Sequence, residues 1–156
     1  MTPAYVAVVG SGEASAADAA VAEEVGRGLA ARGAVVVCGG LGGVMEAACR
    51  GARGEGGVTV GLLPGPDRGA ANPYVSVAIA TGMGEARNAL VVRAADVLVA
   101  VGGSWGTLSE IALAMRVGKR VVGVGTWELA RAGGEPVEGI ERAADAAEAV
   151  GLALGG

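Results

Sequence analysis

The sequence predicts an α/β fold in which a single parallel sheet carries helices on both of its faces. Three observations lead to this prediction. Short apolar runs of strand length alternate along the chain with longer segments of helical character. Hydrophobic residues make up 52% of the chain and aromatic residues only 3%, so small aliphatic side chains must fill the core. The 30 glycines cluster after the apolar runs, where tight turns are needed.

The first half of the chain predicts three strands and two helices. The strands are largely apolar runs, which indicates burial on both faces, and the first of them ends at a glycine. Ser15 and Asp18 resemble a capping box, and Gly33 is placed to end the helix that they begin. In chain order we expect strand 5–10, helix 16–32, strand 34–38, helix 44–51 and strand 57–63.

The second half continues the alternation. Segments 64–73 and 130–136 are rich in Gly and Pro and are expected to be surface loops. Asp145 and Glu148 give a second capping-box signal, for a last helix. In chain order we expect strand 75–80, a turn and helix within 81–95, strand 96–102, a helix to about 117, strand 119–125 and the final helix. The whole chain, 1–156, is therefore expected to form one doubly wound, Rossmann-like domain.

The composition excludes several kinds of chemistry. The chain has no His, so neither a His-activated nucleophile nor a His-bound metal can form, and we predict no metal site. Cys38 and Cys49 form neither a CxxC pair nor a disulfide framework. We expect both to be small buried thiols in a reducing cytoplasm.

Charge and hydropathy exclude two classes of partner. The net charge is −4 and no basic cluster is present, which argues against nucleic-acid binding. The N-terminal segment lacks the features of a signal peptide. The longest apolar stretch, 89–101, is interrupted by Arg93 and Asp96, so no membrane span is expected. We therefore expect a cytoplasmic protein without nucleic-acid or membrane partners.

Glycine-rich loops follow four of the expected strands, at 10–13, 39–43, 81–87 and 102–107. In a parallel sheet all such loops meet at the carboxyl edge, where ligands bind. Glycine turns that lead into helix N-termini expose backbone N–H groups and the positive end of a helix dipole, a combination that binds phosphate. The competing interpretation is that each glycine only permits a sharp turn.

Two common phosphate-binding motifs are missing from these loops. The chain has no GxxxxGK[ST] motif, and the dinucleotide fingerprint lacks its third glycine at Ser15 and a carboxylate after the second strand. We therefore expect a smaller phosphorylated ligand than NAD. The candidate phosphate-binding residues are Gly10, Ser11, Gly39, Gly40, Gly43, Gly103, Ser104, Gly106 and Thr107.

Two charged residues border these loops. Arg87 lies in the first turn of its expected helix, where the helix dipole disfavours a cation. It is either a solvated side chain paired with Glu85 or Asp96, or it is held to meet a phosphate or a carboxylate. Thr107 and Glu110 form a T-x-x-E pattern, which on spacing alone predicts a capping box; the alternative is that Glu110 takes part in chemistry.

The segment "GMGEARNALVVRAADVLVAVGGSWGTLSEIALAMRVGKRVV", 82–122, resembles the cytokinin-activating phosphoribohydrolase family, whose members were long labelled "possible lysine decarboxylase". The segments "CGGLGGVMEAACRGA" and "GGVTVGLLPG" resemble the short branch of that family that contains molybdenum cofactor carrier proteins. The similarity covers about 5–125.

The resemblance implies roles for particular residues. The hydrolase motif is PGGxGTxxE, preceded by an Arg-Lys pair, and its Gly, Gly, Thr and Glu positions fall on Gly103, Gly106, Thr107 and Glu110. In the hydrolases the Arg and the Glu are the catalytic pair, and the Gly-Thr turn holds the phosphate. The Arg position falls on Arg87, so the resemblance implies that Arg87 and Glu110 are the catalytic residues of any such activity.

This sequence departs from the motif at three positions. Gly102 replaces Pro, Ser104 replaces Gly, and Asn88 replaces Lys. These departures bear on hydrolysis more than on phosphate binding, because Ser104 removes no backbone N–H group. The lysine decarboxylase label is rejected, because a pyridoxal enzyme needs a Schiff-base lysine in its site. The single lysine, Lys119, is expected in a helix-to-strand turn at the opposite edge of the sheet.

Three functions remain open. The first is binding of a phosphorylated nucleotide or pterin-type ligand, as in a molybdenum cofactor carrier, with no cofactor required for catalysis. The second is a nucleoside 5′-monophosphate phosphoribohydrolase. The third is a ligand sensor whose output is assembly, since the resemblance implies a homodimer or homotetramer. Trp105 is placed to stack on a base, or else only to pack.

Overall fold

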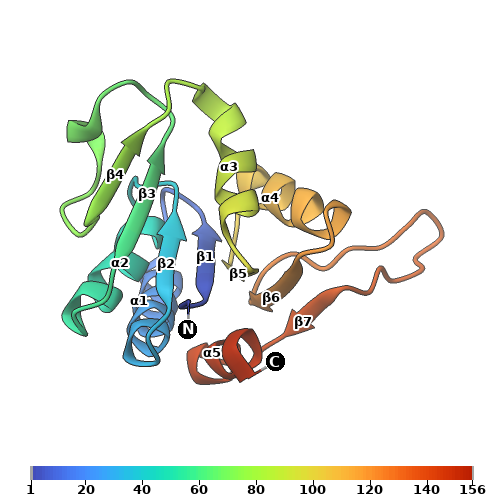
Figure 1. The fold of residues 1–156 in the computed structure, drawn as a ribbon. Helices are drawn as coiled ribbons and strands as arrows, with labels where there is room; N and C mark the ends of the chain where they lie inside the picture. The colour runs from blue at the N-terminus through green and yellow to red at the C-terminus, as the bar shows by residue number, and fades with distance from the viewer. Residues whose placement is uncertain (1, 156) are drawn as a thin grey trace.

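Within residues 2–155, which the computed structural model describes, seven strands form one sheet (Figure 1). The strands are β1 (Tyr5–Gly10), β2 (Val35–Cys38), β3 (Thr59–Leu63), β4 (Val77–Ala80), β5 (Val97–Val101), β6 (Arg120–Val124) and β7 (Ile140–Arg142). Their order in the sheet is β4-β3-β2-β1-β5-β6-β7, and every neighbouring pair is parallel. The predicted parallel sheet is thus confirmed.

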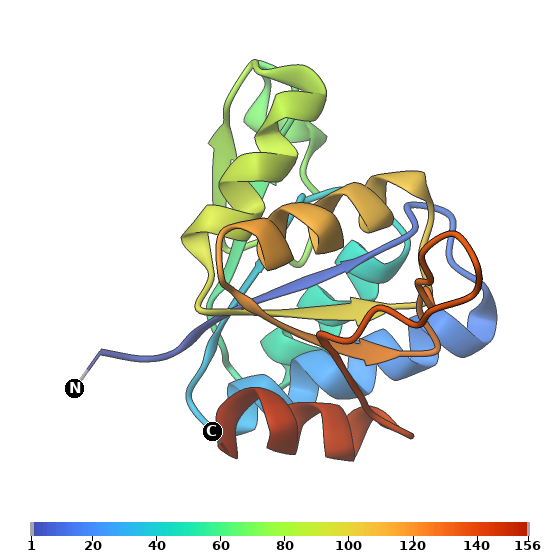
Figure 2. The ribbon, with the colours of Figure 1, turned by 90° about the vertical axis from the view of Figure 1, so that its right-hand side faces the viewer.

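Helices cover both faces of this sheet, as Figure 2 shows. They are α1 (Ala16–Ala31), α2 (Val44–Gly54), α3 (Arg87–Ala94), α4 (Trp105–Arg116) and α5 (Ala146–Gly155), with short 3-10 turns η1 (Arg68–Ala70) and η2 (Gly84–Ala86). One face carries α1, α2 and α5, and the other carries α3 and α4. The doubly wound arrangement predicted from the sequence is confirmed. No helix within residues 2–155 has the length and apolar character that a bilayer crossing requires.

The central strands are buried on both faces because their side chains alternate. In β1, Val6 and Val8 join the core under α1, α2 and α5, whereas Ala7 and Val9 join the core under α3 and α4. All four are at most 3% exposed. Small aliphatic residues therefore fill both layers, as the composition predicts.

Two details differ from the sequence prediction. Helix α2 continues to Gly54 rather than ending at Gly51. Strand β7 was not expected, because Ile140 is its only apolar residue and no alternating pattern announces it. Its place at the edge of the sheet is supported by polar contacts, since the Arg120 guanidinium forms two hydrogen bonds with the carboxylate of Glu141.

The chain reverses its direction of travel across the sheet between β1 and β5. From β1 the chain proceeds outward through β2, β3 and β4, then returns to the other side of β1 and proceeds through β5, β6 and β7. At such a switch point the loops after the two central strands diverge to opposite faces. The diverging loops leave a crevice at the carboxyl ends of β1 and β5, which is where the site described below lies.

Helices α1 and α2 pack in direct backbone contact through two glycines. A Cβ atom on Gly51 would lie 1.9 Å from the carbonyl oxygen of Glu23, and one on Gly26 would lie 2.0 Å from the carbonyl oxygen of Ala48. We predict that Gly51→Ala lowers the free energy of unfolding by about 1–3 kcal/mol, because the helices must separate to accept the methyl group. Denaturant titration measures this change.

The matched control lies in the same helix. A Cβ atom on Gly54 meets nothing within 4 Å, so Gly54→Ala is expected to leave stability unchanged or raise it by up to about 1 kcal/mol. Equal stability of the two variants would show that α1 and α2 do not pack as closely as described.

Candidate functional site

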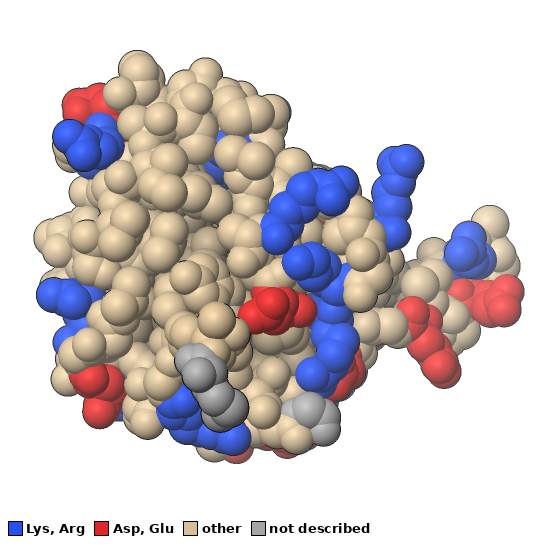
Figure 3. All heavy atoms as spheres, viewed as in Figure 1, with Lys and Arg blue, Asp and Glu red and all other residues tan. Residues whose placement is uncertain are grey.

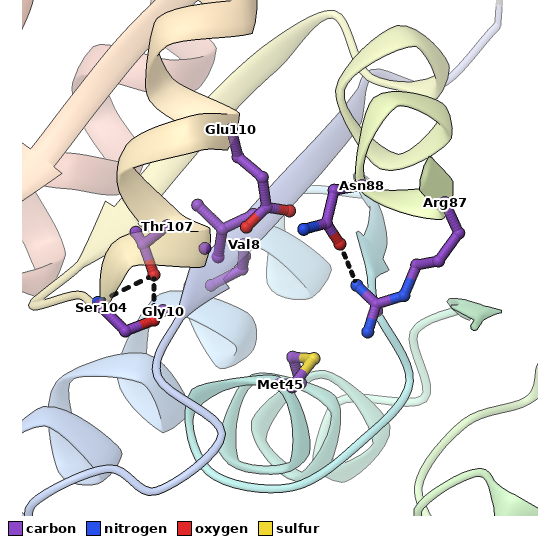
Figure 4. Close-up of a pocket in the computed structure, with 11 residues that line it drawn as sticks. Val8, Gly10, Met45, Arg87, Asn88, Ser104, Thr107 and Glu110 are labelled. Carbon is purple, nitrogen blue, oxygen red and sulfur yellow. Dashed lines mark hydrogen bonds between the residues drawn. The ribbon is translucent and has the colours of Figure 1, made fainter. Parts of the chain in front are cut away.

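A cavity of about 140 Å³ opens at the carboxyl end of β1, between the first turns of α3 and α4 (Figure 4). Its floor is formed by the end of β1, and its walls come from the loop after β2, from α2, and from the two helices. Seven of the residues proposed from the sequence line it: Gly10, Gly39, Arg87, Ser104, Gly106, Thr107 and Glu110. Residues from four separate loops are therefore brought together at one edge of the sheet.

Four other candidates do not line this cavity: Ser11, Gly40, Gly43 and Gly103. The Ser11 hydroxyl accepts a hydrogen bond from the backbone N–H of Glu13, two residues on. Gly43 has φ +65°, and a Cβ atom there would lie 2.1 Å from the carbonyl oxygen of Ser11. Gly40 is similar, with φ +77° and no room beside Leu63. In these positions the glycines permit tight turns, as the competing interpretation holds.

Gly103 faces a different space. It has φ +140° and lines a separate cavity of about 240 Å³ at the ends of β5 and β6, together with Gly125 and Trp127. The turn from Gly103 to Thr107 therefore separates two cavities, and only its second half borders the site.

The first turn of α4 is capped by residues other than those expected. Ser104 is the N-cap, and its backbone N–H donates to Thr107 Oγ1 at 3.2 Å. The prediction that Thr107 and Glu110 form the capping box is wrong, because α4 begins at Trp105 and Glu110 lies one turn further on. The N–H groups of Trp105 and Gly106 lie in the first turn, where no helical carbonyl can accept from them. The positive end of the helix dipole also lies at this turn.

Arg87 is the first residue of α3 and is 9% exposed. Among residues 2–155 it pairs with neither Glu85 nor Asp96, and its Nη1 donates instead to Asn88 Oδ1 at 2.6 Å. Its Nε is buried and has no partner. The guanidinium lies against Gly39, where a Cβ atom would be 2.4 Å from Nη1. Burial lowers the pKa of Arg87, while the charge of Glu110 acts in the opposite direction.

Glu110 is 7% exposed and reaches into the cavity from α4, toward the space that Arg87 enters from α3 (Figure 4). Burial raises the pKa of its carboxyl to about 7, and the Arg87 charge opposes this rise. No ion pair within the described chain joins the two side chains. A guanidinium and a carboxyl group therefore border the same cavity without neutralising each other by direct contact.

The positive charge at this site is local. On the face shown in Figure 3, most Lys and Arg side chains lie in a band to the right of the centre, and others lie at the left and lower edges. Among the described residues that line this cavity, Arg87 is the only basic one. The arrangement suits a small anionic group better than an extended polyanion.

A second cavity adjoins the first. It has a volume of about 450 Å³, lies between α3 and α4, and shares Asn88, Gly106 and Glu110 with the inner one. We call it the outer groove. Sequence reasoning did not identify Asn88 or Met45 as lining residues. The only signal for Asn88 was its departure from the Arg-Lys pair of the resembling family.

Two further expectations concern residues outside the cavity. Cys38 and Cys49 are free and fully buried, as predicted, and the structure places their Sγ atoms 3.5 Å apart. Lys119 lies in the turn between α4 and β6, at the edge of the sheet opposite the cavity, and its Nζ donates to the carbonyl oxygen of Ala95. Within residues 2–155 no group of three His, Cys, Asp or Glu side chains could hold a metal ion.

The sequence and the fold are similar to those of known proteins. An uncharacterised protein from Archaeoglobus fulgidus is 45% identical over 116 residues, which cover 74% of this chain and 76% of that protein. The solved structure of the molybdenum cofactor binding protein from the phototrophic bacterium Rippkaea orientalis is 31% identical, with a TM-score of 0.86 and coverage of 97% and 96% of the two chains. The molybdenum cofactor carrier protein from Chlamydomonas reinhardtii is 35% identical, with a TM-score of 0.83 and coverage of 97% and 95%.

These similarities confirm the resemblance found in the sequence and the Rossmann-like fold. A family model described as the SLOG cluster4 family matches residues 3–150, which is nearly the whole chain. The protein belongs to the SLOG cluster4 family.

Proposed function

We propose that this protein binds a small phosphorylated ligand, either a nucleotide or a pterin-type molecule, in the cavity between α3 and α4, and that it serves as a molybdenum cofactor carrier-like protein. One observation carries the proposal. Arg87 is buried at the N-terminus of α3, where the helix dipole disfavours a cation. It lines an open cavity, and its Nε has no hydrogen-bond partner. A buried cation held in this way is stabilised by an anion that occupies the cavity.

The first turn of α4 supplies the second half of an anion site. Its N–H groups and its dipole favour a phosphoryl group beside Gly106 and Thr107. Arg87 supplies charge from the opposite wall. Together they offer a phosphate backbone donors on one side and a guanidinium on the other, and charge-assisted hydrogen bonds of this kind are strong.

The two cavities have room for more than a phosphate. The inner cavity of about 140 Å³ is too small for a nucleotide, whereas the outer groove adds about 450 Å³, and small-molecule sites typically span about 300–1,000 Å³. Neither His nor Cys is among the described residues that line them. A molybdenum cofactor would therefore be held through its phosphate and organic part. The names of the Rippkaea and Chlamydomonas proteins, which bind or carry that cofactor, support this choice of ligand.

The second candidate function is a nucleoside 5′-monophosphate phosphoribohydrolase. It is favoured by Glu110, because a carboxyl with a pKa of about 7 that faces a guanidinium across a cleft is suited to catalysis. In that reaction Glu110 would stabilise the oxocarbenium-like ribose or steer the attacking water, and Arg87 would position Glu110 and the substrate. The departures at Gly102, Ser104 and Asn88 make this the second choice.

Two measurements test these functions. Native mass spectrometry of the purified protein is expected to detect a phosphorylated organic molecule that leaves on denaturation. Incubation with AMP is expected to show binding without release of adenine and ribose 5-phosphate. Release that is lost in Glu110→Ala would instead establish the hydrolase. Failure of inorganic phosphate, AMP and a phosphorylated pterin to bind would contradict both functions.

From the resemblance we further propose a homodimer or homotetramer, which sedimentation equilibrium tests.

A further inference from the structure

The two tryptophans of the chain pack against each other beside the site. Their ring centroids are 5.1 Å apart and the ring planes are tilted by 37°. Trp105 is nevertheless 77% exposed, more than any other large hydrophobic residue of the described chain. It lies in the first turn of α4, next to Gly106, and lines the outer groove. A large aromatic side chain left in solvent beside a cavity has no role in the core and is typical of a contact surface.

Trp105 is held from behind by Trp127. The Trp127 Nε1–H donates to the carbonyl oxygen of Ser104 at 3.1 Å, and the Trp127 carbonyl accepts from Arg142 Nη1 at 2.7 Å. The first bond joins the Trp127 ring to the turn that begins α4, and the second joins its backbone to β7. One part of the Trp105 indole therefore rests on a fixed partner, while most of its surface is open to a ligand.

The opposite wall of the outer groove leaves space for a flat molecule. Ala86 and Ala89, at and just before the start of α3, contribute only methyl groups to that wall. The groove joins the inner cavity at Gly106 and Glu110. A ligand whose phosphate lies at the first turn of α4 can therefore extend directly past Gly106 into the groove, where Trp105 is the largest surface available.

The polar lining of the groove indicates what kind of group enters it. Glu85, Asn88, Ser109 and Glu110 line it, and none of its described lining residues is Lys or Arg. Carboxylates accept hydrogen bonds and repel a second anionic group. The groove therefore suits a neutral planar ring that carries N–H donors at its edge.

We propose that the outer groove binds the planar nitrogen heterocycle of the ligand, stacked on Trp105, with Trp127 as the positioning residue. This inference rests on the proposed binding of a phosphorylated ligand and adds the orientation of that ligand and the class of its ring. The phosphate lies in the inner cavity, and the ring lies between α3 and α4. Trp105 thereby distinguishes ring-bearing phosphates from simple sugar phosphates.

Calorimetric titration of the full chain with GMP, a phosphorylated pterin and ribose 5-phosphate tests this orientation. The wild-type protein is expected to bind at least one ring-bearing ligand about tenfold or more tightly than ribose 5-phosphate, as base stacking on an aromatic side chain provides. Trp105→Ala is expected to abolish that preference and to change the affinity for ribose 5-phosphate less than about twofold. Trp127→Phe keeps a ring behind Trp105 and should retain most of the preference. Met83→Ala, which removes another exposed apolar side chain outside the groove, should retain all of it.

Intrinsic fluorescence gives an independent readout, because both tryptophans of the chain lie at this site. The ring-bearing ligand is expected to quench the emission, and ribose 5-phosphate is not. Equal affinities of all three ligands for the wild-type protein, or an unchanged preference in Trp105→Ala, would overturn the inference while leaving phosphate binding intact. The same holds if Trp105→Ala alters only the oligomeric state, which would make Trp105 a contact between copies of the chain. Failure of every phosphate to bind would overturn the proposed function itself.

Discussion

Arg87→Met is expected to weaken the binding of a phosphorylated ligand about 100-fold without reducing the stability of the protein. Loss of affinity follows because Arg87 is the only basic side chain among the described residues that line the two cavities, and truncating one partner of a buried charge pair costs about 2–5 kcal/mol. Isothermal titration calorimetry with ribose 5-phosphate measures the change.

Unlike its affinity for the ligand, the stability of Arg87→Met is expected to equal or exceed that of the wild-type protein. Arg87 is buried, its Nε lacks a partner, and burial lowers its pKa, so the empty site bears the cost of an incompletely compensated cation. Arg87→Met fills a similar volume without a charge, and its thermal midpoint is expected to equal or exceed that of the wild-type protein. A variant that loses affinity because it unfolds would instead show a lower midpoint.

Two further variants separate charge from position. Arg87→Lys keeps the charge and loses the planar fork, so its affinity should lie between those of the wild type and the Met variant. Gly39→Ala keeps Arg87 intact but places a methyl group where the guanidinium lies, and the end of that flexible side chain must move. It should also show intermediate affinity at near wild-type stability. Wild-type affinity in Arg87→Met would contradict the proposed role of this residue.

Glu110→Gln is expected to stabilise the protein above pH 7 by about 3 kcal/mol. The carboxyl of Glu110 has a pKa raised by burial from 4.5 to about 7 in the folded protein. Between these values the folded state holds a proton that the unfolded state has released, so the stability of the wild-type protein falls as the pH rises through this window. Each pKa unit corresponds to about 1.4 kcal/mol, and the glutamine variant avoids the loss.

The prediction is tested by the difference in unfolding free energy between the wild-type protein and Glu110→Gln. Denaturant titrations from pH 4.5 to 8.5 should show a small gap at the acid end, a gap that widens toward pH 7, and a constant gap beyond it. Glu55→Gln, which alters an exposed carboxylate at the end of α2, is the matched control and should follow the wild-type curve. A gap between wild type and Glu110→Gln that does not change with pH would mean that Glu110 is not buried as described.

Much of this fold could be predicted because its central strands have a clear sequence pattern. Runs such as Tyr5–Gly10 and Val97–Val101 are apolar at every position, as burial on both faces requires, and glycine follows each one closely. Strand β7 carries no such pattern, because it is a short edge strand in which Ile140 alone packs against a core and the other two side chains are charged. An edge strand with charged side chains has no hydrophobic pattern by which it could be recognised in the sequence.

The candidate site, like the fold, could be predicted from the sequence only in part. Arg87, Ser104, Gly106 and Glu110 could be placed together because loops after parallel strands must meet at one edge. The capping role of Glu110 was mistaken, because Ser104 and Thr107 offer the same chemistry one turn earlier. Nothing local in the sequence could show how side chains from different elements meet.

Contacts of that kind include the packing of Trp127 behind Trp105 and the position of the Arg87 guanidinium on Gly39. They depend on distances between elements that are far apart in the chain. The same is true of Gly43, whose conformation serves the close approach of the loops after β1 and β2 rather than a ligand. A glycine that binds phosphate and one that permits a turn look alike in a sequence.

A crystal structure of the protein soaked with GMP or a phosphorylated pterin tests the central claim most directly. The account predicts the phosphoryl group within hydrogen-bonding distance of the backbone N–H groups at the start of α4, with Arg87 on the opposite wall and the ring between α3 and α4. Phosphate density at another place, such as the loop at Gly40–Gly43 or the cavity beside Gly125, with the space between Arg87 and Glu110 left to solvent, would contradict it.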